Sequence, residues 1–118
     1  MLTTKSLKFF LKDKTVASIL IGSILINLAV WLNLLRIKKT TELIPLHYNI
    51  YFGIDYIGEW HKLFTIAGVG LLVLLINFLL SLLFYFKDKF IAYTLLITAL
   101  FVQIILILSS LAIVWINI

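Results

Sequence analysis

The residues able to do chemistry gather in one short segment, IPLHYNIYFGIDYIGEW, residues 44–60, which lies between two long apolar runs. This segment contains the chain's single proline, and with His61 just beyond its end it accounts for both histidines. His47, Asp55, Glu59 and His61 carry side chains that bind zinc or another divalent cation. Their spacing matches no compact metal-binding motif, so metal binding is a minor hypothesis and no cofactor is expected.

Hydrolytic chemistry would require a nucleophile with a neighbouring base. The segment has no serine, the chain has no cysteine, and Thr40 and Thr41 precede His47 by seven and six positions. We therefore expect no enzymatic activity. The favoured role for His47 and Asp55 is to hold the segment together by hydrogen bonds, with Asp55 also placed to cap the following helix.

Composition indicates the elements that carry this segment. Hydrophobic residues make up 64% of the 118 residues, against roughly 45–50% in an average soluble domain. Three runs without charged residues, 15–35, 63–86 and 90–118, each reach the ~20 residues that a helix needs to cross ~30 Å of hydrocarbon. The sequence predicts an all-α integral membrane protein: one domain with three transmembrane helices, an outer loop over 36–62 and an inner turn over 87–89.

Residues 1–14 precede the first run as a basic amphipathic segment. Helical spacing places lysines on one face and apolar residues on the other, which is typical of a helix lying on a membrane surface: Lys5, Lys8 and Lys12 against Leu7, Phe10 and Leu11. Thr3 or Thr4 is the expected N-cap, and a frayed, solvated tail is the alternative. The second helix is expected to extend back to about Ile57.

The net charge of +5 is explained by basic residues that flank the spans, so the expected partner is the lipid bilayer and not nucleic acid. Six lie on the side of the N-terminus and four on the other: Lys5, Lys8, Lys12, Lys14, Lys87 and Lys89, against Arg36, Lys38, Lys39 and Lys62. The positive-inside rule then predicts a cell-membrane protein with a cytoplasmic N-terminus and the C-terminus outside. Three spans also place Trp31, Trp60 and Trp115 near one face, as interfacial tryptophans prefer.

The runs contain no ionisable residue, which disfavours proton-coupled transport. Three amides remain, Asn27, Asn77 and Gln103, at about 18, 14 and 20 Å from the inner helix ends. Lipid cannot satisfy an amide, so we expect these side chains to pair inside a three-helix bundle. Contact with a ligand or solute is the alternative.

The loop itself alternates apolar and polar residues from Leu46 to Tyr56, which predicts an extended, half-buried segment laid on the membrane surface or over the helix ends. Gly53 is expected to bend it. Pro45 holds Ile44 in an extended conformation and prevents a helix from continuing.

Seven loop residues also carry a resemblance to a known family: Pro45, His47, Tyr48, Asn49, Gly53, Asp55 and Gly58. Their order resembles the P-x-H-aromatic-N…G…D…G signature between the first two spans of SdpI-like membrane proteins, whose named member is an immunity protein against a sporulation-delaying toxin. One extra residue precedes the glycine. The family pattern also has a lysine downstream, which has no clean equivalent here because Gly58 is followed by Glu59 and Trp60. The similarity extends over residues 15–86, and fuller members have additional spans. The resemblance implies an immunity-like role for the loop.

Two functions therefore stand as the main hypotheses, and an enzyme or metal-dependent site on the outer face is a minor third. In the first, the loop makes the chain a binding or protection module that contacts an envelope peptide, a toxin or another membrane protein. In the second, the chain is a structural subunit or assembly factor of a larger membrane complex, with the third span packed against a partner.

Overall fold

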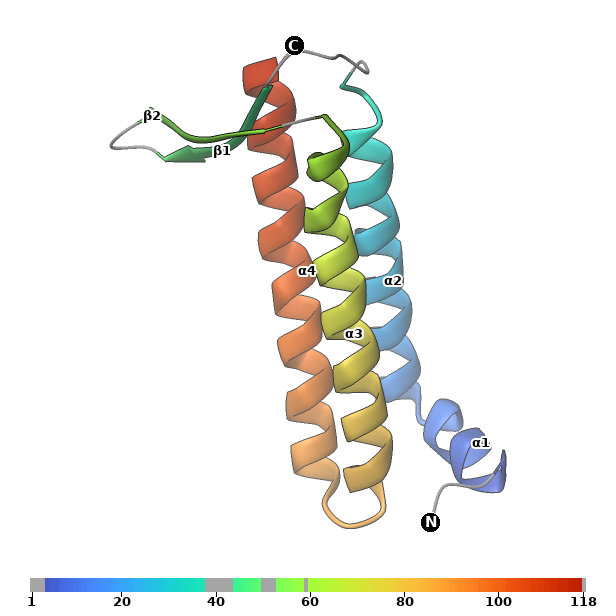
Figure 1. Ribbon diagram of the computed structural model, residues 1–118. Coiled ribbons are helices and arrows are strands. Elements are labelled where there is room, and N and C mark those ends of the chain that lie inside the picture. The colour runs from blue at the N-terminus through green and yellow to red at the C-terminus, as the bar shows by residue number, and fades with distance from the viewer. Residues whose placement is uncertain (1–3, 38–43, 50–52, 59, 118) are drawn as a thin grey trace.

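A computed structural model describes residues 4–37, 44–49, 53–58 and 60–117, with residues 44–49 and 53–58 described by their backbone (Figure 1). Three long helices run side by side: α2 (Lys14–Leu34), α3 (Phe64–Tyr85) and α4 (Lys89–Asn117). Helices α2 and α4 are each long and apolar enough to cross a membrane, and so is α3 when the short helical turn before it is included. The prediction of three long apolar helices is confirmed, and α4 lies parallel to α2 with α3 antiparallel to both (Figure 1).

The N-terminal segment forms its own helix, α1 (Thr4–Lys12), so residues 4–12 are not a frayed tail. Helix α1 folds against the bundle because one apolar side chain is completely buried: the Phe10 ring lies 5.6 Å from the Phe78 ring and 5.1 Å from the Tyr85 ring. Asp13 separates α1 from α2 and caps α2, accepting hydrogen bonds from the backbone N–H groups of Thr15 and Val16. Thr3, one of the two predicted caps, lies outside the described residues.

The segment between α2 and α3 changes the predicted form of the ordered loop. It contains two antiparallel strands, β1 (Ile44–Asn49) and β2 (Gly53–Gly58), in place of one extended segment bent at Gly53. Five of the twelve strand residues are Ile or Tyr, which suit strands, and each strand supplies backbone partners for the other.

Helix α3 begins later than predicted. Ile57 belongs to β2, and a 3₁₀ turn, η1 (Trp60–Leu63), intervenes before α3 starts at Phe64. The residue at the N-cap position is Leu63, so Asp55 does not cap the helix. Because Ile57 and Gly58 are paired in β2, they cannot form the extra helical turn that was predicted.

Side-chain packing divides the bundle into two apolar clusters. The inner cluster, at the α1 end, contains Phe10, Leu20, Leu74, Leu82 and Leu96. The outer cluster, at the hairpin end, contains Val30, Leu34, Leu63, Ala67 and Ile113. Buried Asn27 and Gln103 lie between the two clusters along α2 and α4.

Gly70 permits the close approach of α3 to the other two helices at this level. A Cβ atom at residue 70 would lie 2.6 Å from Leu106 Cδ1, and 3.0 Å from both Asn27 Nδ2 and Gln103 Oε1. Gly68, two residues earlier, has nothing within 4 Å of such an atom. The same substitution at these two positions therefore separates a packing effect from a helix-propensity effect.

We expect Gly70→Ala to lower the free energy of unfolding by about 1–3 kcal/mol, because an extra methyl group in a packed contact forces its neighbours apart. Gly68→Ala is the matched control and should be neutral or slightly stabilising, since alanine is the better helix former. Unfolding of both purified variants in detergent measures the difference. Equal stability of the two variants would contradict the tight contact at Gly70.

Candidate functional site

The two strands form a hairpin that projects sideways from the end of the bundle where α4 terminates (Figure 1). Strand β1 is the strand in contact with α4, and it also touches η1. The residues of the loop signature therefore lie on two paired strands, and β1 packs against α4.

The register of the hairpin brings the signature residues together. His47 is opposite Tyr56, Tyr48 is opposite Ile54, and Asn49 is opposite Gly53. Asp55 lies between the residues that face His47 and Tyr48, so His47 and Asp55 occupy neighbouring positions across the two strands. Pro45 and Gly58 belong to the base, where they face Ile57 and Ile44.

The pairing is irregular at the same place. The register shifts between Pro45 and His47, and again between His47 and Tyr48, which leaves Leu46 and Asp55 as the extra residues on their strands. Such bulges bend a strand, change the direction of a side chain and are frequent next to functional sites. The irregularity is centred on the two residues that the sequence singled out, His47 and Asp55.

An aromatic cluster connects the base of the hairpin to the bundle. Trp60 Nε1 donates a hydrogen bond to the Ile37 carbonyl at 3.0 Å, which ties η1 to the end of α2. The Trp60 ring meets Phe64 edge-on at 5.0 Å, and Phe64 stacks on Trp31 at 5.8 Å. Two of the three tryptophans therefore lie together at this end. Trp115 belongs to the last turn of α4, whose C-terminal end lies beside the hairpin (Figure 1).

The described side chains do not test the metal-binding hypothesis, because those of His47, Asp55 and Glu59 are not among them. No group of three or more His, Asp or Glu residues comes together in the part of the chain that the structure describes. His61 is exposed on η1, and Glu59 lies outside the described residues.

Below the aromatic cluster, Asn27 and Gln103 pair as predicted. Asn27 Nδ2 donates to Gln103 Oε1 at 2.9 Å and to the Ala67 carbonyl at 3.2 Å. Gln103 Nε2 donates to the Gly70 carbonyl at 2.8 Å, and Trp31 Nε1 donates to Asn27 Oδ1 at 3.0 Å. This amide layer joins all three long helices.

Asn77 does not join the amide layer, which corrects the prediction that all three amides pair with one another. It is half-buried and donates from Nδ2 to the Leu95 carbonyl of α4 at 2.9 Å. Along the antiparallel α3, Asn77 lies seven residues from Gly70, almost two helical turns towards the inner end. Its separation from Gln103 along the bundle explains why it bonds to backbone instead.

A second polar pair was not predicted. Asn33 Nδ2 donates to Ser110 Oγ at 3.0 Å, Ser110 Oγ donates to the Ile107 carbonyl, and Arg36 Nη1 donates to Asn33 Oδ1 at 3.1 Å. The spacing of polar residues on α2 and α4 could have predicted this second pair. Asn27 and Asn33 are six residues apart on α2, and Gln103 and Ser110 are seven apart on the parallel α4, so two polar layers can form at matching heights.

The inner end holds a third polar cluster, centred on Asp13. The Tyr85 hydroxyl donates to Asp13 Oδ2 at 2.7 Å and the Tyr93 hydroxyl donates to the same oxygen at 2.5 Å. These bonds, from Tyr93 first and then Tyr85, lower the pKa of the Asp13 carboxyl below its ordinary value of 3.8. One carboxylate thus connects the α1–α2 junction to α3 and α4.

The fold and these clusters define a small helical bundle with three helices able to cross a membrane, sealed by buried polar pairs and carrying a β-hairpin at one end. Comparisons of the chain with protein-family models, curated proteins and solved structures find no match.

We expect Asn27→Leu to lower the free energy of unfolding in detergent by about 1–2 kcal/mol, because it leaves Gln103 Oε1 and Trp31 Nε1 without their partners. Asn77→Leu is the matched control. It removes one bond to a backbone carbonyl and should cost about 0.6 kcal/mol. An equal or larger effect at Asn77 would contradict a central role for the amide layer.

Asp13→Asn tests the polar cluster around Asp13, since asparagine still caps a helix but accepts weaker bonds from the tyrosines. We expect a loss of about 1 kcal/mol at pH 7 and faster amide hydrogen exchange in α1, with Asp88→Asn at the cap of α4 as control. Because the folded state lowers the pKa of Asp13, its contribution is complete above pH 3.8 and disappears as the pH falls through the folded-state value. The difference from the wild type should therefore narrow under acid conditions, and a pH-independent difference would contradict the assignment.

Proposed function

We propose that this chain is a membrane-anchored binding or protection module whose hairpin contacts an envelope peptide or toxin at the outer surface of the cell membrane. The observation that carries the proposal is the irregular strand pairing centred on His47 and Asp55. The bundle supplies the anchor, and the hairpin supplies the contact surface.

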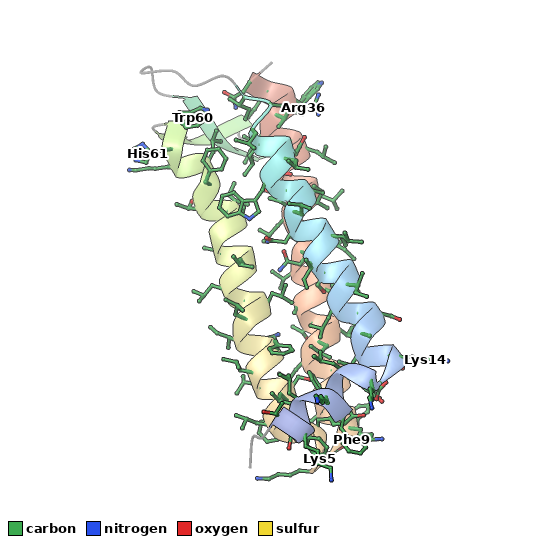
Figure 2. All side chains as sticks on the ribbon, turned by 90° about the vertical axis from the view of Figure 1, so that its right-hand side faces the viewer. Lys5, Phe9, Lys14, Arg36, Trp60 and His61 are labelled. Atoms are coloured by element: carbon green, nitrogen blue, oxygen red, sulfur yellow. The ribbon has the colours of Figure 1, made fainter. Side chains whose placement is uncertain are left out.

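The distribution of charge supports the orientation. Lys5, Lys8, Lys12 and Lys14 belong to or adjoin α1, at the end opposite Arg36 and the hairpin (Figure 2). Lys87 and Lys89 add two more basic residues at the α1 end, in the α3–α4 turn. Under the positive-inside rule, α1 and the N-terminus are cytoplasmic, and the hairpin and C-terminus are outside.

The hairpin also suits an extended peptide as ligand. In a two-stranded sheet each strand has one edge that the ladder leaves unpaired, and a peptide can add there through backbone hydrogen bonds. Side chains at alternate positions then determine which peptide is accepted. This mode agrees with the resemblance of the loop signature to SdpI-like immunity proteins, whose named member protects against a toxin.

A structural role in a larger complex is the second candidate, and the outer face of α4 favours it. Phe101 and Trp115 are 63% and 75% exposed along a helix of 29 residues, so this face has large aromatic side chains available to a neighbouring helix. Affinity purification in mild detergent separates the two candidates. A stoichiometric membrane partner that is lost from a Phe101→Ala variant supports the subunit role.

The protection role is tested by survival of cells that express the chain and are challenged with a sporulation-delaying toxin. We expect His47→Ala and Asp55→Ala to abolish protection while the amount of protein in the membrane stays normal. His61→Ala, a histidine on η1 outside the hairpin, is the matched control and should retain protection. Protection by both hairpin variants would overturn the proposal, and loss of the protein from the membrane would assign the two residues a folding role.

A further inference from the structure

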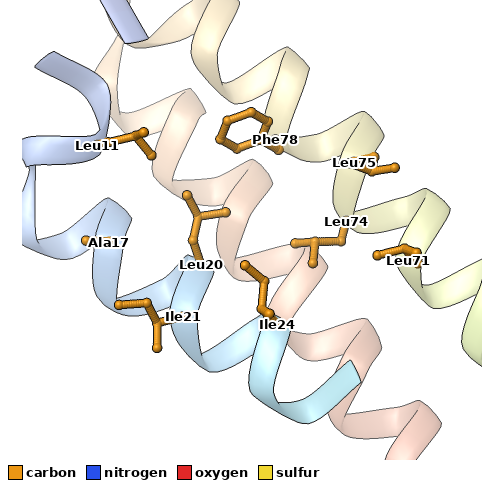
Figure 3. Close-up of a pocket in the computed structure, with 9 residues that line it drawn as sticks. All are labelled: Leu11, Ala17, Leu20, Ile21, Ile24, Leu71, Leu74, Leu75 and Phe78. Carbon is orange, nitrogen blue, oxygen red and sulfur yellow. The ribbon is translucent and has the colours of Figure 1, made fainter. Parts of the chain in front are cut away.

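Helices α2 and α3 leave an apolar groove between them in the half of the bundle nearest α1 (Figure 3). The groove has a volume of about 590 Å³, and its lining contributes no polar surface. Buried Leu20 and Leu74 form its floor, Ile24 and Leu75 form exposed parts of its walls, and Leu11 of α1 closes one end. It arises because both helices pack on α4 more extensively than on each other.

The depth of the groove matches the inner half of a bilayer. Its lining on α2 extends from Ala17 to Ile24 and on α3 from Leu71 to Phe78, which is about 10 Å along each helix. The end at Leu11 lies against α1, the amphipathic helix expected at the membrane surface. The groove therefore runs from the headgroup level into the hydrocarbon.

An open groove at this depth needs an apolar occupant, because a void leaves its lining without dispersion contacts. Water would find no polar partner there, since the lining is wholly apolar. A linear acyl chain suits a narrow groove that is open along its side to the lipid.

Basic residues near the end of the groove that Leu11 closes indicate a negatively charged headgroup on the occupant. Lys14 lies one turn before Ala17 on α2, and Lys8 lies one turn before Leu11 on α1. With Lys12 they are exposed, and they form no ion pair within the described ranges 4–37, 44–49, 53–58 and 60–117. The nearest acidic group, Asp13, already accepts bonds from two tyrosine hydroxyls and two backbone N–H groups.

We propose that the groove between α2 and α3 holds an acyl chain of an anionic phospholipid whose headgroup is bound by Lys8, Lys12 and Lys14. The apolar lining selects a hydrocarbon chain, and the three ammonium groups select negative charge. Such a lipid would hold α1 against the bundle at the inner leaflet. This site is distinct from the hairpin and does not depend on the function proposed for it.

Native mass spectrometry of the full chain in detergent tests the proposal, with phosphatidylglycerol and phosphatidylcholine of identical acyl chains as the probes. We expect phosphatidylglycerol to bind about tenfold more tightly or better, given about fivefold for each basic residue near an anionic headgroup. The combined Lys8→Gln, Lys12→Gln and Lys14→Gln variant should lose this preference. Lys62→Gln combined with Lys87→Gln removes basic residues elsewhere and should keep it.

A second pair of variants tests the acyl chain. Ala17→Phe fills the groove and should weaken the binding of both lipids about tenfold, whereas Ala29→Phe, on an exposed position of α2 outside the groove, should not. Thermal unfolding without added lipid confirms that both variants are folded. A retained preference in the triple lysine variant, or unchanged binding in Ala17→Phe, overturns the proposal. Release of a copurifying polypeptide by Ala17→Phe would overturn it too, because the groove would then be a docking site for a helix.

Discussion

The amide layer is the interaction on which the rest of the structure depends. A buried primary amide has no solvent to bond with, so Asn27 and Gln103 are stable at mid-bundle only when paired inside the protein. Their pairing fixes the height of α2 against α4, and the bonds to the Ala67 and Gly70 carbonyls fix the height of α3 against both. Apolar contacts alone would fix these heights less firmly, because dispersion and hydrophobic contacts are non-directional.

The long helices were predictable because length and the absence of charge are sufficient to identify a segment that can cross hydrocarbon. The hairpin was not, since alternation has the same period in one long strand as in two short ones. Nothing in residues 44–58 resembles the Asn-Gly or Asp-Gly dipeptides that identify a tight turn. The expected helical extension to Ile57 was wrong because pairing with β1 competes with helix formation.

The candidate site was predicted in part. Sequence spacing selected His47 and Asp55, but only the register shows that they are neighbours at an irregular part of the ladder. Two of the three amides pair as expected, whereas Asn77 lies at a different height. Asp13 was missed because its tyrosine partners are 72 and 80 residues away, and no local pattern relates a helix cap to residues that distant.

The Asp13 cluster also has a consequence for the order of assembly. Asp13 precedes the three long helices in the chain, whereas Tyr85 and Tyr93 lie on either side of the turn between α3 and α4. The bond from Tyr93 can therefore form only after α4 has packed beside α3. Before that, α1 has the contacts of Phe10 with Phe78 and Tyr85 of α3 but lacks the bond that connects Asp13 to α4. The complete Asp13 cluster therefore requires all three long helices to be in place, although its carboxylate belongs to the junction that precedes the first of them.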